Sequence, residues 1–167
     1  MSFATAAHGK DSAAEIERAA EDRAAALILR GVQRLLRSHG FESLAEVSLA
    51  NGRRADVMAI GPAGEIHIIE IKSSRADFLS DGKWPEYRDY CDAFAFAVAP
   101  TFPVELLPEA AGLILADAYG GEIVRPPVGA PLVAARRKAL TLAFARLAAT
   151  RLLALRDPAQ AIEQSGF

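Results

Sequence analysis

Apolar residues in the first part of the chain recur every fourth position. This spacing lines them along one side of a helix, where they can face a core. The residues of this stripe are Ile16, Ala20, Ala24, Ile28, Val32 and Leu36. A capping box of Ser12 and Glu15 is typical of a helix start, and Gly40 of a helix stop. The pattern predicts an amphipathic helix between Ser12 and Gly40, preceded by a flexible tail at residues 1–11.

After Gly40 the apolar residues change to alternation with polar ones. Alternation is typical of strands that bury one face. Asn51-Gly52 and the sequence Gly-Pro-Ala-Gly at 61–64 are turn signals between such strands. We therefore predict an antiparallel meander of three strands, at residues 41–49, 53–60 and 65–72.

The rest of the chain continues the α/β pattern. Residues 75–92 are charged and aromatic and predict a helix with an irregular start, whereas the apolar run 94–99 predicts a buried strand. Because a helix separates this strand from the meander, we expect it to pair in parallel. A hairpin at 113–125 and a final helix after Pro131 follow. The prediction is one α/β domain over residues 12–167, with a mixed sheet flanked by helices.

Composition narrows the class of protein. The chain has 167 residues, of which 51% are hydrophobic and 24% charged, as expected for one globular domain. A formal net charge of −2 argues against coating nucleic acid by bulk charge but leaves room for a local basic patch. Cys91 is the only cysteine, which excludes a disulfide framework within one chain. The start resembles no signal peptide and charges interrupt every apolar run, so we expect a cytoplasmic protein without membrane partners.

The third predicted strand ends in charged residues. Side chains alternate along a strand, so Ile66, Ile68, Glu70 and Lys72 share one face. Asp56 lies on the preceding strand, and the register set by the turn at 61–64 brings it near Glu70. The sequence therefore predicts two converging carboxylates beside a lysine.

Two close carboxylates repel unless a proton or a cation neutralises them. A hard divalent ion such as Mg²⁺, or Mn²⁺ in its place, suits such oxygen ligands, and the main-chain carbonyl of Ile71 would add another. Lys72 would orient or help deprotonate a metal-bound water and stabilise charge on a phosphate. This combination indicates hydrolysis of phosphodiester bonds.

The same residues also fit a surface ion cluster, in which Asp56 and Glu70 pair with Lys72 and Arg54. Structural ion networks gather charges as functional sites do. The three residues alone leave both interpretations open.

The order of the predicted elements, together with Asp56 and the tripeptide Glu70-Ile71-Lys72, resembles the PD-(D/E)XK nuclease superfamily, which has the restriction-endonuclease-like fold. The stretch IIEIKSSRADFLSDGKWPEYRDYCDAFAFAV, residues 68–98, is more specific and resembles the MmcB-like DNA repair family of bacteria. The likeness covers roughly residues 12–157.

This resemblance implies that Asp56 and Glu70 are metal ligands, with the Ile71 carbonyl, and that Lys72 is the catalytic lysine of a metal-dependent nuclease. The superfamily's usual proline before the first acid is replaced here by Ala55. Many members carry another acid on the first helix. The candidates for that acid in this chain are Glu17, Glu21 and, on the first strand, Glu46.

The segment after the tripeptide offers candidate DNA contacts. Ser73 would bond a phosphate, Lys83 would contact the backbone and Trp84 would stack on an exposed base. Each has a structural alternative: the serines cap the next helix, Lys83 is solvated, and Trp84 packs on the sheet, the commoner role of a tryptophan. Other residues of the same rim would be Asp77, Asp81, Tyr87 and Asp92.

The final helix is the one strongly basic element, with no acid before Asp157. Its first basic residues, Arg136, Arg137 and Lys138, would contact the phosphate backbone of DNA. Alternatively they form a solvated face while the leucines of the helix pack inward. The sequence does not distinguish these interpretations.

We therefore expect a magnesium-dependent nuclease of DNA repair, with DNA, other repair proteins and a second copy of the chain as partners. The alternative is a catalytically silent DNA- or protein-binding accessory factor of repair that keeps the fold, because fold does not settle activity. Retention of Asp56, Glu70 and Lys72 favours the enzyme. The acidic overall charge and the unassigned helix acid favour the accessory factor.

Overall fold

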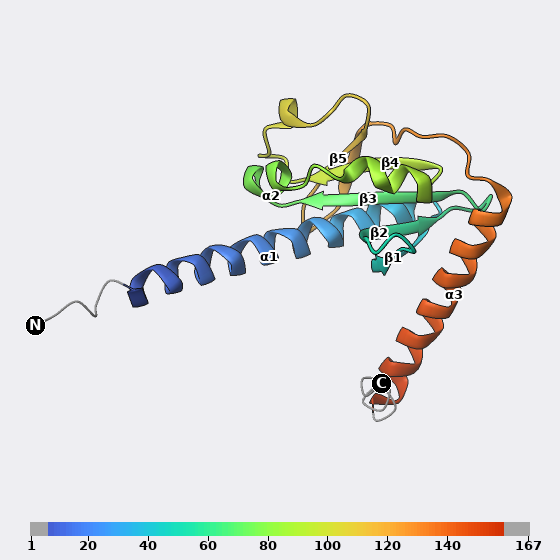
Figure 1. The fold of residues 1–167 in the computed structure, drawn as a ribbon, viewed down its shortest axis with the longest axis horizontal. Helices are drawn as coiled ribbons and strands as arrows, with labels where there is room; N and C mark the ends of the chain where they lie inside the picture. Colours follow the sequence, from blue (N-terminus) through green and yellow to red (C-terminus); the bar gives the residue numbers. More distant parts are fainter. Residues whose placement is uncertain (1–6, 159–167) are drawn as a thin grey trace, which may run out of the picture.

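The computed structural model describes residues 7–158, with side chains from residue 13 onward. Its centre is a six-stranded sheet whose strands follow the chain order (Figure 1). Pairing is antiparallel except between β3, β4 and β5, which are parallel. The strands are β1 (Glu42–Ser48), β2 (Arg54–Ile60), β3 (Ile66–Lys72), β4 (Ala93–Val98), β5 (Gly112–Ala116) and β6 (Gly121–Arg125). The predicted α/β class, the meander and the parallel strand are confirmed.

Helices cover both faces of this sheet. α1 packs on one face, where Ile28, Val32 and Leu36 meet alternate residues of β2, β3 and β4. The other face carries Phe94 and Phe96 and is covered by η1 and the start of α3. The helices are α1 (Ala7–Ser38), α2 (Arg75–Ser80) and α3 (Ala134–Arg156), with 3₁₀ turns η1 (Trp84–Tyr90) and η2 (Val104–Leu106).

The first helix begins earlier than the sequence predicts. It starts at Ala7, so the capping box at Ser12 lies inside the helix, and part of the predicted tail is helical. Gly9 is the only weak helix former between Ala7 and Ser12, and a single glycine costs only about 1 kcal/mol. The rest of the predicted tail, residues 1–6, lies outside the described residues.

The predicted helix at 75–92 is two separate short elements. α2 ends at Ser80, where the main-chain N–H of Asp81 donates to the carbonyl of Phe78. Gly82 and Pro85 follow, and proline cannot donate the hydrogen bond that an α-helix would need there. The chain therefore resumes as the 3₁₀ turn η1, with its proline near the start.

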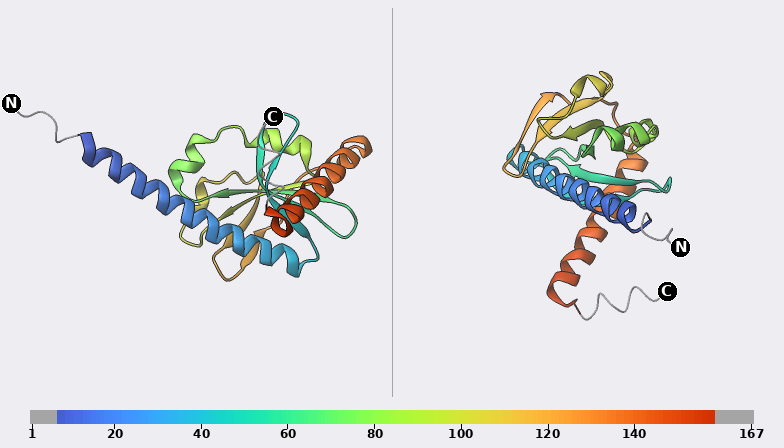
Figure 2. Two further views of the ribbon diagram at one scale, coloured as in Figure 1. Left: turned by 90° about the horizontal axis from the view of Figure 1, so that it is seen from below. Right: turned by 90° about the vertical axis from the view of Figure 1, so that its left-hand side faces the viewer.

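Both long helices extend beyond the sheet. The N-terminal half of α1 and the C-terminal half of α3 leave the body in different directions (Figures 1 and 2). Inward packing of the leucines was one of the two alternatives for α3; of these leucines Leu140 is buried and Leu147 partly so, as is Phe144. Leu142, Leu152 and Leu153 are exposed because they lie on other sides of the helix than Leu140, Phe144 and Leu147.

Candidate active site

A cleft of about 1010 Å³ opens where β3 ends. Its walls are α1, the β1–β2 hairpin and α2, and Asp56, Glu70 and Lys72 all line it. The structure therefore brings the three predicted residues together. Acidic side chains outnumber basic ones in the lining: Glu21, Asp22, Glu46, Asp56, Glu70 and Asp77 against Arg53, Arg54 and Lys72.

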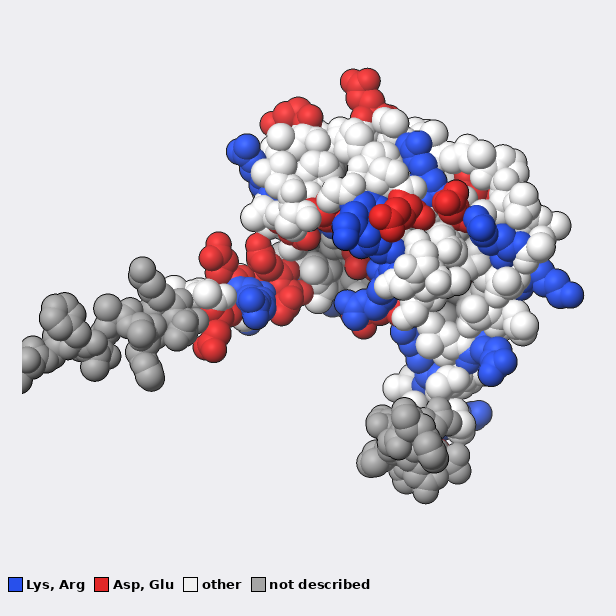
Figure 3. All heavy atoms as spheres, in the orientation of Figure 1, with Lys and Arg blue, Asp and Glu red and all other residues white. Residues whose placement is uncertain are grey.

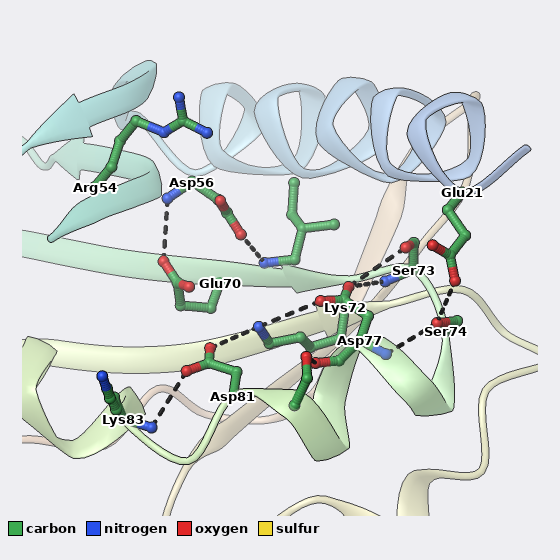
Figure 4. A network of polar contacts seen from close by, with 12 residues as sticks. Glu21, Arg54, Asp56, Glu70, Lys72, Ser73, Ser74, Asp77, Asp81 and Lys83 are labelled. Carbon is green, nitrogen blue, oxygen red and sulfur yellow. Dashed lines mark hydrogen bonds and ion pairs between the residues drawn. The ribbon is translucent and has the colours of Figure 1, made fainter. Parts of the chain in front are cut away.

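Strand register places the two carboxylates next to each other, as predicted. Val57 pairs with Ile69, so Asp56 comes opposite Glu70. The main-chain N–H of Asp56 donates to Glu70 Oε1 at 3.1 Å, and that of Ile71 donates to Asp56 Oδ2 at 2.8 Å (Figure 4). Each carboxylate is thereby held by the neighbouring strand's backbone rather than by a flexible side chain.

One oxygen of each carboxylate, Asp56 Oδ2 and Glu70 Oε1, is held by these main-chain hydrogen bonds. The side chain of Tyr87 also interacts with Glu70. The N–H and C=O of one strand residue point the same way, so the carbonyl of Ile71 faces β2 and Asp56, as its N–H does. Among the described residues no group of three or more His, Cys, Asp or Glu forms a metal cluster. The donor set is thus two carboxylates and a carbonyl, a small set that Mg²⁺ completes with water.

Burial and mutual repulsion make both carboxylates reluctant to ionise. Glu70 is 3% exposed, and its burial together with the charge of Asp56 raises the pKa of Glu70 to about 8. Burial also raises the pKa of Asp56 above its ordinary value, although the hydrogen bond from Ile71 opposes this. A divalent cation would relieve this repulsion, so the electrostatics fit a metal site.

Lys72 is buried and forms an ion pair with Asp81. Only 5% of the residue is exposed, and its Nζ donates to Asp81 Oδ2 at 2.7 Å, with Asp77 Oδ1 at 3.8 Å. Burial lowers the pKa of Lys72, but the hydrogen bond with Asp81 and the charge of Asp77 outweigh it and raise that pKa overall. Lys72 is therefore positively charged at neutral pH and suits charge stabilisation better than proton removal.

The surface ion cluster does not form. Glu70 and Lys72 are buried, and Arg54 contacts Glu46 at 3.4 Å rather than Asp56. The sequence pattern missed the pairing of Lys72 with Asp81. It had no signal for this pairing, because the contact depends on how α2 ends.

Two of the three candidate helix acids line the cleft. Glu21 of α1 accepts a hydrogen bond from Ser74 Oγ at 2.8 Å (Figure 4), and Glu46 of β1 lies on the opposite wall. Glu17 is absent from the lining. Glu46 also has a positive φ of 52°, unusual for a residue with a side chain, and Arg151 of α3 donates to its carbonyl at 3.0 Å.

The serines after β3 organise the start of α2. Ser74 is its N-cap and accepts from the N–H of Asp77 at 3.1 Å, which confirms the capping interpretation. Ser73 lines the cleft, and its N–H donates to Asp77 Oδ2 at 3.0 Å. The carboxylate of Asp77 therefore lies between Ser73 and Lys72.

Trp84 and Lys83 do not line the cleft. Trp84 stacks on Phe94 with ring centroids 5.5 Å apart, and the Arg88 guanidinium lies 4.8 Å from its ring centre. This packing favours the structural interpretation of Trp84 over base stacking. Lys83 is exposed, and Tyr87 is buried with its hydroxyl donating to the carbonyl of Arg54 at 3.0 Å.

The basic start of α3 lies away from the cleft and anchors the helix. Arg137 donates to both carboxylate oxygens of Asp92 at 2.6 Å, and Arg136 donates to the carbonyl of Asp89 at 2.7 Å. Asp92 belongs to this anchor and not to the predicted rim. Lys138 is exposed and outside the cleft lining. Arg136 and Arg137 thus have structural partners, and the DNA contact of Arg136, Arg137 and Lys138 stays a prediction.

The sequence matches a known protein family. Residues 11–159 match the family described as DNA repair protein MmcB-like. The chain belongs to the MmcB-like DNA repair family. The MmcB-like resemblance drawn from residues 68–98 is therefore confirmed over nearly the whole chain.

One solved structure is similar to this MmcB-like chain. It is the SPO1766 protein of unknown function from Silicibacter pomeroyi, with 54% sequence identity and a TM-score of 0.76. The match covers 80% of this chain and 92% of that one. A search of curated proteins found no significant match. Within the described residues, no helix has the length and apolar character needed to cross a membrane.

Proposed function

We propose that this MmcB-like protein is a metal-dependent deoxyribonuclease of the PD-(D/E)XK type, acting in DNA repair. The observation that carries the proposal is the pair Asp56 and Glu70, which lines a large cleft and is fixed by main-chain hydrogen bonds. A merely structural role would give this pair a cationic partner, yet Lys72 pairs with Asp81 instead. DNA is the expected substrate because the family is one of DNA repair.

Asp56, Glu70 and the carbonyl of Ile71 would hold Mg²⁺ or Mn²⁺. Such an ion polarises a phosphoryl oxygen and makes water a better nucleophile when bound. Lys72 supplies a fixed positive charge beside the carboxylates, suited to the charge that builds on a phosphate during hydrolysis. Asp81 holds that ammonium group through the 2.7 Å hydrogen bond.

A second candidate is an accessory factor of DNA repair that binds DNA or protein without cutting. Two observations favour it: the cleft lining is predominantly acidic, and Lys72 is already engaged by Asp81 and Asp77. An acidic cleft without a metal repels the phosphate backbone. The two candidate functions therefore differ in one measurable property: only the nuclease cuts DNA when a divalent ion is present.

The test is cleavage of labelled single-stranded, duplex and branched DNA with Mg²⁺, Mn²⁺ or EDTA. We expect metal-dependent cutting that Asp56→Asn and Lys72→Met each reduce by at least about 100-fold. Arg37→Met is the matched control for loss of a positive charge, since Arg37 is exposed and outside the cleft lining, and it should cut like wild type. Binding of DNA without cutting on any substrate or metal would support the accessory factor. Cutting that survives Asp56→Asn would indicate a contaminating nuclease.

A further inference from the structure

The exposed face of α3 is an apolar stripe without a partner in the described chain. Leu142 is 58% exposed and Leu152 56%, and Ala145 and Ala149 lie between them. Their spacing of three and four residues aligns them on one side of the helix, opposite Leu140, Phe144 and Leu147, which face the sheet. Soluble proteins rarely leave such a stripe uncovered.

A second unpartnered stripe runs along the projecting half of α1. Ala13, Ile16, Ala20 and Ala24 repeat at the same three- and four-residue spacing. Ile16 is 70% exposed, and Ala13 and Ala20 are exposed as well. The two stripes cannot meet within one molecule, because these helix halves project in different directions (Figure 2).

The charges on the two helices are opposite. α3 carries six basic residues and no acid. The projecting part of α1 is richer in acids than in bases: Asp11, Glu15, Glu17, Glu21 and Asp22 against Lys10, Arg18 and Arg23. Figure 3 shows acidic side chains gathered over that part of α1 and basic ones over α3. Two α3 helices would repel each other, whereas α1 and α3 attract.

We propose that two copies of the chain form a two-fold dimer, in which the projecting half of α1 from each copy packs antiparallel on α3 of the other. Each copy offers one surface of each kind, so two equivalent contacts satisfy all four stripes and close the assembly. The contact is coiled-coil-like, with apolar residues spaced by three and four positions on both helices.

Side-chain sizes fit the antiparallel arrangement. When Ile16 is set opposite Ala149, Ala13 comes opposite Leu152, and Ala24 comes one residue from the position opposite Leu142. Each large side chain thus meets a small one, which lets the helices interdigitate. In the same register Glu17 and Arg146 lie on the same side of the helix pair and at a similar height, next to the apolar seam.

Sedimentation over a range of protein concentrations, with light scattering, tests the dimer. Wild type should dimerise, and Ile16→Glu or Leu152→Glu should each weaken dimerisation by at least about 100-fold, because each change affects both contacts. Tyr119→Glu is the control; this side chain is 85% exposed on the turn before β6 and should not affect association. Circular dichroism should show that all variants remain folded.

Mixing the two variants identifies which helices meet. Ile16→Glu keeps an intact α3 and Leu152→Glu keeps an intact α1, so the mixture should form a heterodimer through one contact although neither variant self-associates. Glu17→Arg and Arg146→Glu should each weaken the wild-type dimer by about tenfold, and combining them in one chain should restore it.

Three outcomes overturn the proposal. Wild type that stays monomeric at every concentration removes the dimer. A dimer lost in Leu152→Glu but kept in Ile16→Glu indicates pairing between α3 helices. A monomer that binds vesicles of anionic lipid through α3, with binding lost in Leu152→Glu, assigns the basic apolar helix to a membrane surface instead.

Discussion

At the scale of single residues, Glu70 links the candidate site to the stability of the fold. Its folded pKa is about 8, whereas an unfolded glutamate titrates near pH 4.3. Below both values the carboxyl is protonated in both states. As pH rises between them, only the unfolded state ionises, so stability falls until the folded group also loses its proton.

Glu70→Gln removes this penalty while keeping an oxygen for the N–H of Asp56. In EDTA we expect nearly equal unfolding temperatures at pH 3.5 and a variant that is several degrees more stable at pH 8.5. Thermal unfolding by circular dichroism measures this, with the exposed Glu105→Gln as control. A variant that is less stable than wild type at pH 8.5 would contradict the buried, repelled state of Glu70.

Variants of the carboxylates and of the lysine should distinguish metal binding from catalysis. Mg²⁺ bound only to the folded state raises the unfolding temperature, by several degrees when the ion is in large excess over its Kd. We expect Asp56→Asn to lose this rise and Lys72→Met to retain it, because Lys72 is not a ligand. Titration calorimetry provides the second readout. Equal loss of Mg²⁺ binding in both variants would contradict this division of roles.

These residues also show what sequence can predict about a site. Strand parity and the hairpin turn place Asp56 beside Glu70, since both rules act over a few residues. The partner of Lys72 could not be predicted in this way. It depends on Asp81 at the end of α2, whose position follows from tertiary packing rather than from periodicity.

At the scale of elements, Asp92 joins β3, β4 and α3. Its carboxylate accepts from the N–H of Ile66 at 2.7 Å and of Leu132 at 2.8 Å, besides the two hydrogen bonds of Arg137. Burial raises the pKa of Asp92, but Arg137 and these amides lower it below its ordinary value overall. One side chain thus fixes where α3 begins.

Asp92→Asn should reduce the free energy of unfolding by about 3 kcal/mol, because Arg137 loses its partner and the two amides lose a charged acceptor. The loss should be full at neutral pH and shrink below about pH 4, where the unfolded carboxylate takes up a proton while the folded one, with its lowered pKa, is still ionised. Urea unfolding at pH 7 and pH 3 measures both. Glu105→Gln should show neither effect. An unchanged midpoint at pH 7 would contradict the anchoring role.

Local signals predicted most elements correctly but not their breaks. Alternation and turn residues predict the meander, and the final helix follows its prolines as expected. The prediction of one helix at 75–92 was wrong because the spacing of aromatic residues does not show that Asp81, Gly82 and Pro85 together interrupt the helix. The predicted start of α1 was wrong because the sequence of a capping box can also occur inside a helix.

At the scale of the whole molecule, periodicity could not predict shape. Hydrophobic spacing shows which side of a helix can be buried, but not how far the helix runs past its partner. The stripe beginning at Ile16 and the leucines of α3 read as core in the sequence, yet half of each helix projects from the sheet (Figure 1). How far each helix projects depends on the length of the strands, which are shorter than either helix.

The charge of the molecule affects its affinity for DNA. The net charge is −2, and the cleft lining is richer in acids than in bases, so the phosphate backbone is repelled where the candidate chemistry lies. A divalent ion on Asp56 and Glu70 reverses the local charge. DNA affinity should therefore depend on Mg²⁺ rather than on nonspecific basic contacts.

Fluorescence anisotropy with Lys72→Met tests this without cleavage. We expect DNA binding at least about tenfold tighter in Mg²⁺ than in EDTA at matched ionic strength, because neutralised carboxylates no longer repel the phosphate. The double variant Asp56→Asn with Lys72→Met should lose this dependence on Mg²⁺, since it lacks one ligand. Equal affinity of Lys72→Met in Mg²⁺ and EDTA would show that DNA binds elsewhere, and the exposed basic residues of α3, such as Lys138 and Arg146, would be the surface to test next.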